Sequence, residues 1–293
     1  MEDLVNTVLK MSIDEIEEYN FPLDEPFGLE INYNNTKFCF IIKFSSKNKN
    51  LICCGSGAQS REKKEIKHKT KHPPYLDRWS WSEFFEESYL TYADPIFFED
   101  SKIKLGWYAG DDNQWYLEVI SKIISKLCNN QNIQTNNIMF YGTSGGGFAS
   151  ICLGTLIKKS KVLVNNPQLN VLSYYSGHIA DLFRVLKNMK EFSRLSEPEI
   201  KHEINYRLNA INLFKKMDYM PPITYYINIE SDADLNKQFL PFINNLKENS
   251  FTKNELEVHF YSEKKNNPHY PLNSEKSKKL IKSFAKQHLY NDK

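Results

Sequence analysis

The sequence predicts an α/β fold with a mostly parallel sheet, built as one domain over residues 1–293. From residue 113 onward, segments with helical spacing of apolar residues alternate with short β-rich runs, which is typical of a parallel sheet covered by helices. A glycine-rich segment, FYGTSGGGFAS at 140–150, lies at the junction of one such strand and the next helix. The length and the hydrophobic content of 41% are sufficient for one large core.

The first 112 residues are less regular. We expect an amphipathic helix over 3–18, because apolar residues recur there at helical spacing. Two β-rich runs separated by Asn34, Asn35 and Thr36 predict a hairpin. The apolar run LICCGSGA (51–58) predicts a buried strand followed by a tight loop, and KIKLGWYAG (102–110) resembles another strand end.

The regular part predicts helices on both faces of the sheet. Helices are expected at 113–128, 146–159, 236–248 and 273–288, and strands at 137–142, 161–166, 223–230 and 255–262. The segment 171–217 is helical with a break near Ser193–Pro198, and it interrupts the alternation. We interpret it as a helical insertion that serves as a lid or an edge cover.

Composition and charge exclude several classes of protein. The formal net charge of +2 gives no reason to expect a nucleic-acid partner. No apolar stretch approaches the ~20 residues that span a bilayer, and the acidic N-terminus lacks the apolar region of a secretory signal. The five cysteines show no metal-ligand spacing and suit reduced, buried thiols. We therefore expect a cytoplasmic protein without a bound metal or cofactor.

One local exception to the balanced charge is the basic run REKKEIKHKTK at 61–71. A solvated loop explains such a run, and a basic lip that attracts an anionic substrate is the functional alternative.

The glycines of FYGTSGGGFAS indicate a nucleophile elbow around Ser144. The elbow motif G-x-S-x-G requires a strand, a sharp turn and a helix, and G-T-S-G-G has this context. Gly142 and Gly146 would be needed because side chains there would meet neighbouring backbone. A phosphate-binding loop and a dinucleotide-binding loop are the alternatives, but their sequence patterns do not fit.

An elbow serine predicts an acid and then a histidine in later loops. Of the seven histidines, only His269 lies between the last expected strand and the last helix. The acid should follow the strand at 223–230, where Asp232 and Asp234 are both available. We favour Asp232, because it comes first after the strand.

The oxyanion of an acyl-transfer reaction needs backbone donors. Gly145 supplies an N–H directly after Ser144, at the start of a helix whose dipole favours an anion. A second donor is expected from the loop after an earlier strand, where Ser56 and Gly57 are the candidates. An ordinary tight turn explains the same loop.

With these residues placed, the chain resembles the α/β-hydrolase-like proteins of surface-polysaccharide loci, both capsule O-acetyltransferases and accessory proteins of capsule biosynthesis. The likeness lies in PPYLDRWSW (73–81), ADPIFFEDSKIKLGWYAG (93–110), FYGTSGGGFAS (140–150) and VLVNNPQLNV (162–171). The resemblance implies an α/β-hydrolase fold and a triad of Ser144, Asp232 and His269. It also marks N-N-P-Q, Asn165 to Gln168, as a signature, for which we expect a structural role.

The resemblance implies a serine-dependent esterase or O-acyltransferase that acts on a carbohydrate or another acylated small molecule, with acetyl-CoA as the donor in the case of a transferase. Polysaccharide-assembly proteins are the implied partners. Aromatic residues could stack on sugar rings in an acceptor groove, although packing in the core or in loops is the favoured explanation. The candidates are Trp79, Trp81, Trp107 and Tyr108. The alternative function is a non-catalytic scaffold of glycan assembly that keeps the fold.

Overall fold

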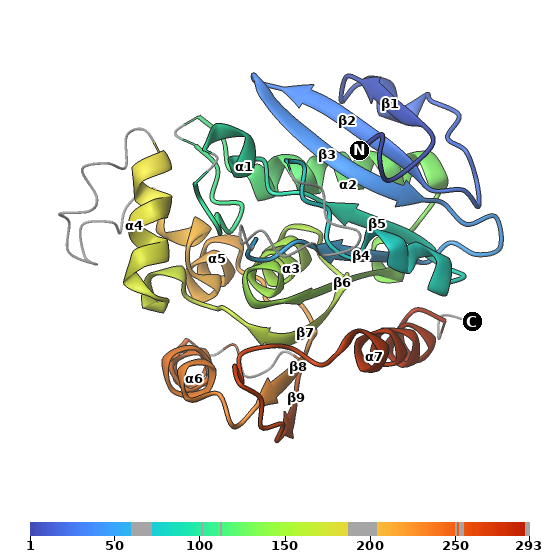
Figure 1. Ribbon diagram of the computed structural model, residues 1–293. Coiled ribbons are helices and arrows are strands. Elements are labelled where there is room, and N and C mark those ends of the chain that lie inside the picture. Colours follow the sequence, from blue (N-terminus) through green and yellow to red (C-terminus); the bar gives the residue numbers. More distant parts are fainter. Residues whose placement is uncertain are drawn as a thin grey trace.

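A nine-stranded sheet runs through the described part of the chain (Figure 1). The computed structural model describes residues 1–59, 72–100, 102–111, 113–186, 204–249, 251 and 255–290. The strands are β1 (Val8–Met11), β2 (Phe27–Tyr33), β3 (Thr36–Lys43), β4 (Leu51–Gly55), β5 (Ser88–Tyr92), β6 (Ile138–Thr143), β7 (Lys161–Pro167), β8 (Ile223–Asn228) and β9 (Leu256–Tyr261). Their order in the sheet is β1-β2-β3-β5-β4-β6-β7-β8-β9.

The sheet is mostly parallel, as the alternation predicts. Strands β5, β4, β6, β7, β8 and β9 pair in parallel, and β2 and β3 form the expected antiparallel hairpin. The carboxyl ends of the parallel strands therefore share one edge of the sheet. Loops that follow β4, β6, β7, β8 and β9 meet at this edge, where ligand sites of open α/β sheets are found.

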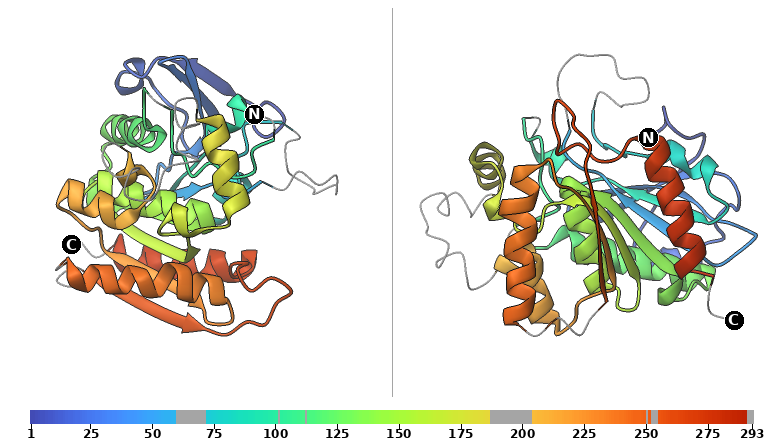
Figure 2. Two further views of the ribbon diagram at one scale, coloured as in Figure 1. Left: turned by 90° about the vertical axis from the view of Figure 1, so that its left-hand side faces the viewer. Right: turned by 90° about the horizontal axis from the view of Figure 1, so that it is seen from below.

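Helices cover both faces of the sheet. The helices are α1 (Ile96–Glu99), α2 (Tyr116–Gln131), α3 (Ser144–Leu156), α4 (Ser176–Val185), α5 (Ala210–Met217), α6 (Leu240–Glu248) and α7 (Ser274–His288). Residues of α2, α3, α5 and α6 are buried together with one face of the central strands, whereas α7 packs on the other. Figure 2, in the view from below, shows α6 and α7 on opposite sides of the strands.

The expected helix at 3–18 is wrong. Residues Val8–Met11 instead form the edge strand β1, which pairs in parallel with β2. A short 3-10 helix, Glu15–Glu17, follows and buries Ile16 completely. The segment contains β-branched residues that suit a strand as well as a helix. Backbone pairing with β2 therefore determines that a strand forms.

The strand expected within 102–110 is also wrong, and β5 was not expected. Residues Trp107 and Tyr108 have φ values of 52° and 55°, so the chain makes a left-handed turn there and no strand forms. β5 is buried along its whole length between β3 and β4, and it therefore lacks the alternation of a half-exposed strand.

The segment 171–217 is helical where it is described, and it divides into two parts. Its first part holds a 3-10 helix, Val171–Ser173, and α4, at the left of Figure 1. Its last helix, α5, packs with α3 and α6 against one face of β7 and β8. The break expected near 193–198 and the basic run at 61–71 both lie outside the described residues. Among the helices that are described, none combines the length and the apolar character needed to cross a membrane.

Candidate active site

Ser144 lies at the turn between β6 and α3, in a left-handed conformation with φ of 54°. Such a conformation is strained for a serine and persists where the surrounding structure enforces it. A Cβ atom at Gly142 would lie 2.1 Å from the carbonyl oxygen of Gly146, and one at Gly146 would lie 2.7 Å from that of Gly55. Because the obstacles are backbone atoms, the expected need for glycine at both positions is confirmed.

His269 lies in the loop after β9, and its imidazole contacts Ser144. Its Nε2 is 2.9 Å from Ser144 Oγ, although the two residues are 125 positions apart in the sequence. The His269 loop is anchored to β7, because the side chain of Asn166 in that strand donates to the His269 carbonyl oxygen over 3.1 Å. The structure thus brings together the serine and the histidine that the chain order predicts.

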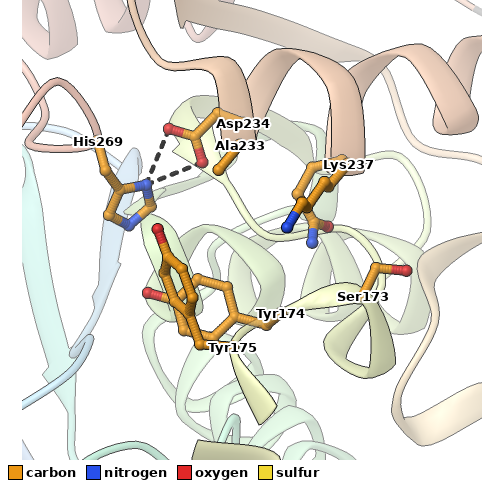
Figure 3. Close-up of a pocket in the computed structure, with 8 residues that line it drawn as sticks. Ser173, Tyr174, Tyr175, Ala233, Asp234, Lys237 and His269 are labelled. Atoms are coloured by element: carbon orange, nitrogen blue, oxygen red, sulfur yellow. Dashed lines mark hydrogen bonds and ion pairs between the residues drawn. The ribbon is translucent and has the colours of Figure 1, made fainter.

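The acid beside His269 is Asp234, so the prediction of Asp232 is wrong. Both carboxylate oxygens of Asp234 lie 2.8 Å from His269 Nδ1 (Figure 3). Asp234 is 2% exposed, and Ser231 Oγ donates to it over 2.6 Å. Asp232 is exposed to solvent.

The error has a structural cause. Asp232 is the first acid after the expected strand, but β8 ends at Asn228 and a π-helix, Ala233–Phe239, begins with Asp232 as its N-cap. In a helical turn, residues two apart point in nearly opposite directions. Asp232 therefore faces solvent when Asp234 faces the sheet edge.

The prediction that the Ser56 N–H binds the oxyanion is wrong. Its backbone N–H donates to the hydroxyl of Tyr108 over 2.8 Å, and the residue is buried. The N–H of Gly57 donates to Asp77 Oδ2 over 3.3 Å, and a Cβ at Gly57 would lie 3.9 Å from the backbone nitrogen of Gly146 in the elbow. Gly145 is in the first turn of α3, where backbone N–H groups lack partners within the helix. Gly57 and Gly145 stay predictions.

The N-N-P-Q segment ends β7 and holds the loops of the site. Asn165 accepts from the N–H of Leu272, and Asn166 accepts from the N–H of Asn228, at the end of β8. These contacts agree with the expected structural role. Gln168 departs from it, because its side-chain Nε2 lies 3.1 Å from Ser144 Oγ.

Two of the four aromatic residues expected to stack on sugars are buried. Trp107 is completely buried and Tyr108 is 1% exposed, so these two predictions are wrong. The ring of Trp81 packs near the Tyr141 ring, and Trp79 packs against a separate core cluster of Val5 and its neighbours. Trp79 and Trp81 are half-buried, so sugar stacking by these two residues stays a prediction.

A different pair of aromatic residues lies at the histidine. Tyr174 and Tyr175 line a cavity of about 20 Å³ together with Lys237, Asp234 and His269 (Figure 3). The Tyr174 ring is 6.2 Å from the His269 ring, and burial raises the pKa of Tyr174 to about 12. Tyr175 is 57% exposed. The only sequence signal for this pair is an adjacent Tyr-Tyr soon after the N-N-P-Q segment.

Among the residues that the structure describes, no group of three or more His, Cys, Asp or Glu side chains is arranged to hold a metal ion. The geometry of Ser144, His269 and Asp234 supports nucleophilic chemistry at the serine. Ser144 Oγ can donate to His269 Nε2, since the carboxylate of Asp234 keeps the imidazole proton on Nδ1. This is the arrangement that makes a serine hydroxyl nucleophilic.

No family model matches the chain, and no curated protein matches its sequence. Solved structures do match. The capsule O-acetyltransferase of Neisseria meningitidis serogroup A is similar over 93% of this chain and 99% of its own, with 15% identity and a TM-score of 0.61. The fluorophosphonate-binding serine hydrolase FphF of Staphylococcus aureus is similar over 92% and 100%, with 11% identity and a TM-score of 0.56.

The esterase Est2 of Thermogutta terrifontis is similar over 95% of this chain and 96% of its own, with 11% identity and a TM-score of 0.52. The predicted likeness to capsule O-acetyltransferases is thus confirmed for the fold. With its mostly parallel sheet, its elbow after β6 and these neighbours, the chain has the α/β-hydrolase fold.

Proposed function

We propose that this protein is a serine-dependent acyl-transfer enzyme, an esterase or an O-acyltransferase, that acts on a carbohydrate. The observation that carries the proposal is the continuous contact from Ser144 Oγ through the His269 imidazole to the buried carboxylate of Asp234. The fold neighbours, which include an O-acetyltransferase and serine hydrolases, support the same class of reaction.

The reaction follows from the three side chains. His269 Nε2 takes the proton as Ser144 Oγ attacks the acyl carbonyl carbon, and the leaving group departs with that proton. Asp234 holds the imidazole in the correct tautomer and stabilises its positive form. Water or a sugar hydroxyl then attacks the acyl-serine, with His269 acting as base again.

The acceptor distinguishes the two activities. A carbohydrate acceptor is supported by the similarity to the capsule enzyme and by the exposed ring of Tyr175 beside the site. One solved neighbour is a complex of that capsule enzyme with CoA, so acetyl-CoA is the donor to test first.

A two-stage experiment tests the proposal. A fluorophosphonate probe should label the wild-type protein at one residue and should leave Ser144→Ala unlabelled, with both proteins equally folded by circular dichroism. Acetyl-CoA and p-nitrophenyl acetate are then supplied with and without oligosaccharides, and hydrolysis is compared with transfer by mass spectrometry. An unlabelled wild-type protein would favour the non-catalytic scaffold.

A further inference from the structure

Gln168 is the one polar side chain, apart from His269, that is recorded in contact with Ser144 Oγ in the described part of the chain. It follows directly after β7 and is completely buried. Its backbone N–H also donates to the Ser144 carbonyl oxygen over 3.1 Å, and Pro167 forms a β-bridge with Ser144. The main chain thus fixes where the Gln168 side chain begins.

The orientation of the Gln168 amide is determined by Trp107. The indole Nε1 of Trp107 hydrogen-bonds to Gln168 Oε1. An indole N–H can only donate, so the group that faces it must be the amide oxygen. The amide nitrogen therefore faces Ser144 and donates to its Oγ.

The result is a chain of hydrogen bonds with one direction. Trp107 donates to Gln168, Gln168 donates to Ser144, and Ser144 donates to His269. His269 in turn donates to Asp234. Each bond in such a chain polarises the next, and all of them favour negative charge on Ser144 Oγ as its proton leaves.

Trp107 itself is rigid. It and Tyr108 are consecutive left-handed residues, and Tyr108 N–H donates to the buried Asp94 over 2.8 Å. The Tyr108 hydroxyl is the partner of the Ser56 N–H. The same turn that orients Gln168 therefore occupies the Ser56 N–H, one of the two loop donors expected for an oxyanion.

We propose, on the basis of the acyl-transfer function above, that the Gln168 side-chain amide replaces the Ser56 N–H as an oxyanion donor, together with Gly145 N–H, and that Trp107 is its positioning residue. When Ser144 Oγ bonds to the acyl carbon, the carbonyl π pair moves to oxygen. This oxygen and Ser144 Oγ are then bonded to the same carbon atom. The oxygen is therefore within reach of the Gln168 amide nitrogen, which lies 3.1 Å from Oγ. A Cβ at Gly145 would lie 3.5 Å from Gln168 Oε1, so the two residues are neighbours.

The rate constant for fluorophosphonate labelling measures this step. Ser144 Oγ forms a bond to phosphorus as its proton passes to His269 Nε2, fluoride leaves, and the phosphoryl oxygen takes the place of the oxyanion. Loss of one such donor typically slows an enzyme about 10²–10³-fold, so we expect that loss for Gln168→Leu. The isosteric Gln168→Glu should be at least as slow, because a carboxylate cannot donate, and it replaces Gln168→Leu if that variant does not fold.

Gln114→Leu is the matched control. Gln114 is another buried glutamine, but its amide donates to Thr36 Oγ1, far from Ser144 in the fold. We expect it to lower the thermal stability and to leave the labelling rate unchanged.

A double-mutant cycle tests the role of Trp107. Trp107→Phe should slow labelling about tenfold in the wild-type background and should have no further effect when Gln168→Leu is present. Equal effects in both backgrounds would show a merely structural tryptophan. Folded Gln168→Leu and Gln168→Glu proteins that label at the wild-type rate would refute the role of Gln168 alone, whereas a wild-type protein without labelling at Ser144 would overturn the proposed function as well.

Discussion

Asp94→Asn should change how the stability of the protein depends on pH. Asp94 is 3% exposed, and its two carboxylate oxygens accept the backbone N–H groups of Ile96, over 3.1 Å, and Tyr108, over 2.8 Å. Burial raises the pKa of this carboxyl from 3.8 to about 7, and the two backbone hydrogen bonds oppose the rise only in part. An acid with this pKa is ionised at pH 8 despite its burial.

The sign follows from proton binding. Between pH 4 and pH 7 the folded protein keeps a proton on Asp94 that the unfolded chain releases, so the stability falls as the pH rises. The contribution is complete below the unfolded pKa and is lost as the pH rises through 7. A rise of the pKa from 3.8 to about 7 corresponds to roughly 4 kcal/mol, of which roughly 3 kcal/mol is lost between pH 5 and pH 8.

Urea unfolding at pH 5, 6, 7 and 8 measures this loss. Asparagine has the shape of the neutral acid but does not titrate, so the free energy of unfolding of Asp94→Asn should rise relative to wild type by roughly 3 kcal/mol over this range. Asp3→Asn removes an exposed carboxylate and should follow the wild-type curve. Parallel curves for Asp94→Asn and wild type would refute the reasoning.

The remaining predictions concern the site and the core. In acyl-donor turnover, Asp234→Asn should lower the rate constant about 10⁴-fold and Asp232→Asn should cost little; the opposite ranking would contradict the geometry. Gly142→Ala should destabilise the protein in thermal unfolding and abolish labelling of Ser144, because its Cβ would meet backbone. A thiol reagent should modify the cysteines only after unfolding, since burial raises their pKa values; early reaction would show that the core opens. The thiols are Cys39, Cys53, Cys54, Cys128 and Cys152.

The parallel half of the fold could be predicted because its signals are local. Helical spacing, β-rich runs and the G-T-S-G-G turn each lie within about 15 residues, and the structure has the corresponding elements from α2 to α7. The N-terminal segment is different. Whether 3–18 forms a helix or an edge strand depends on pairing with β2, which periodicity cannot show.

Within the site, the sequence predicts which residues are available and not which atoms meet. Chain order suffices for Ser144 and His269, because elbow and histidine loop occupy set places in this fold. The choice between Asp232 and Asp234 depends on whether the chain turns helical after β8, a difference of about 200° in direction for residues two apart. Tyr174 and Gln168 reach the site only because β7 ends beside Ser144.

The turn at Trp107 and Tyr108 connects Asp94 to the site, because Tyr108 donates to Asp94 and Trp107 donates to Gln168. Ionisation of Asp94 should nevertheless leave the site unchanged. Ionisation of Asp94 costs stability because the charge is buried, yet a carboxylate accepts the Tyr108 N–H at least as strongly as the neutral acid does. The anchor of the turn is therefore kept on both sides of pH 7, and with it the bond from Trp107 to Gln168. The pH dependence of Asp94 should accordingly appear in global unfolding and not in the orientation of the amide at Ser144.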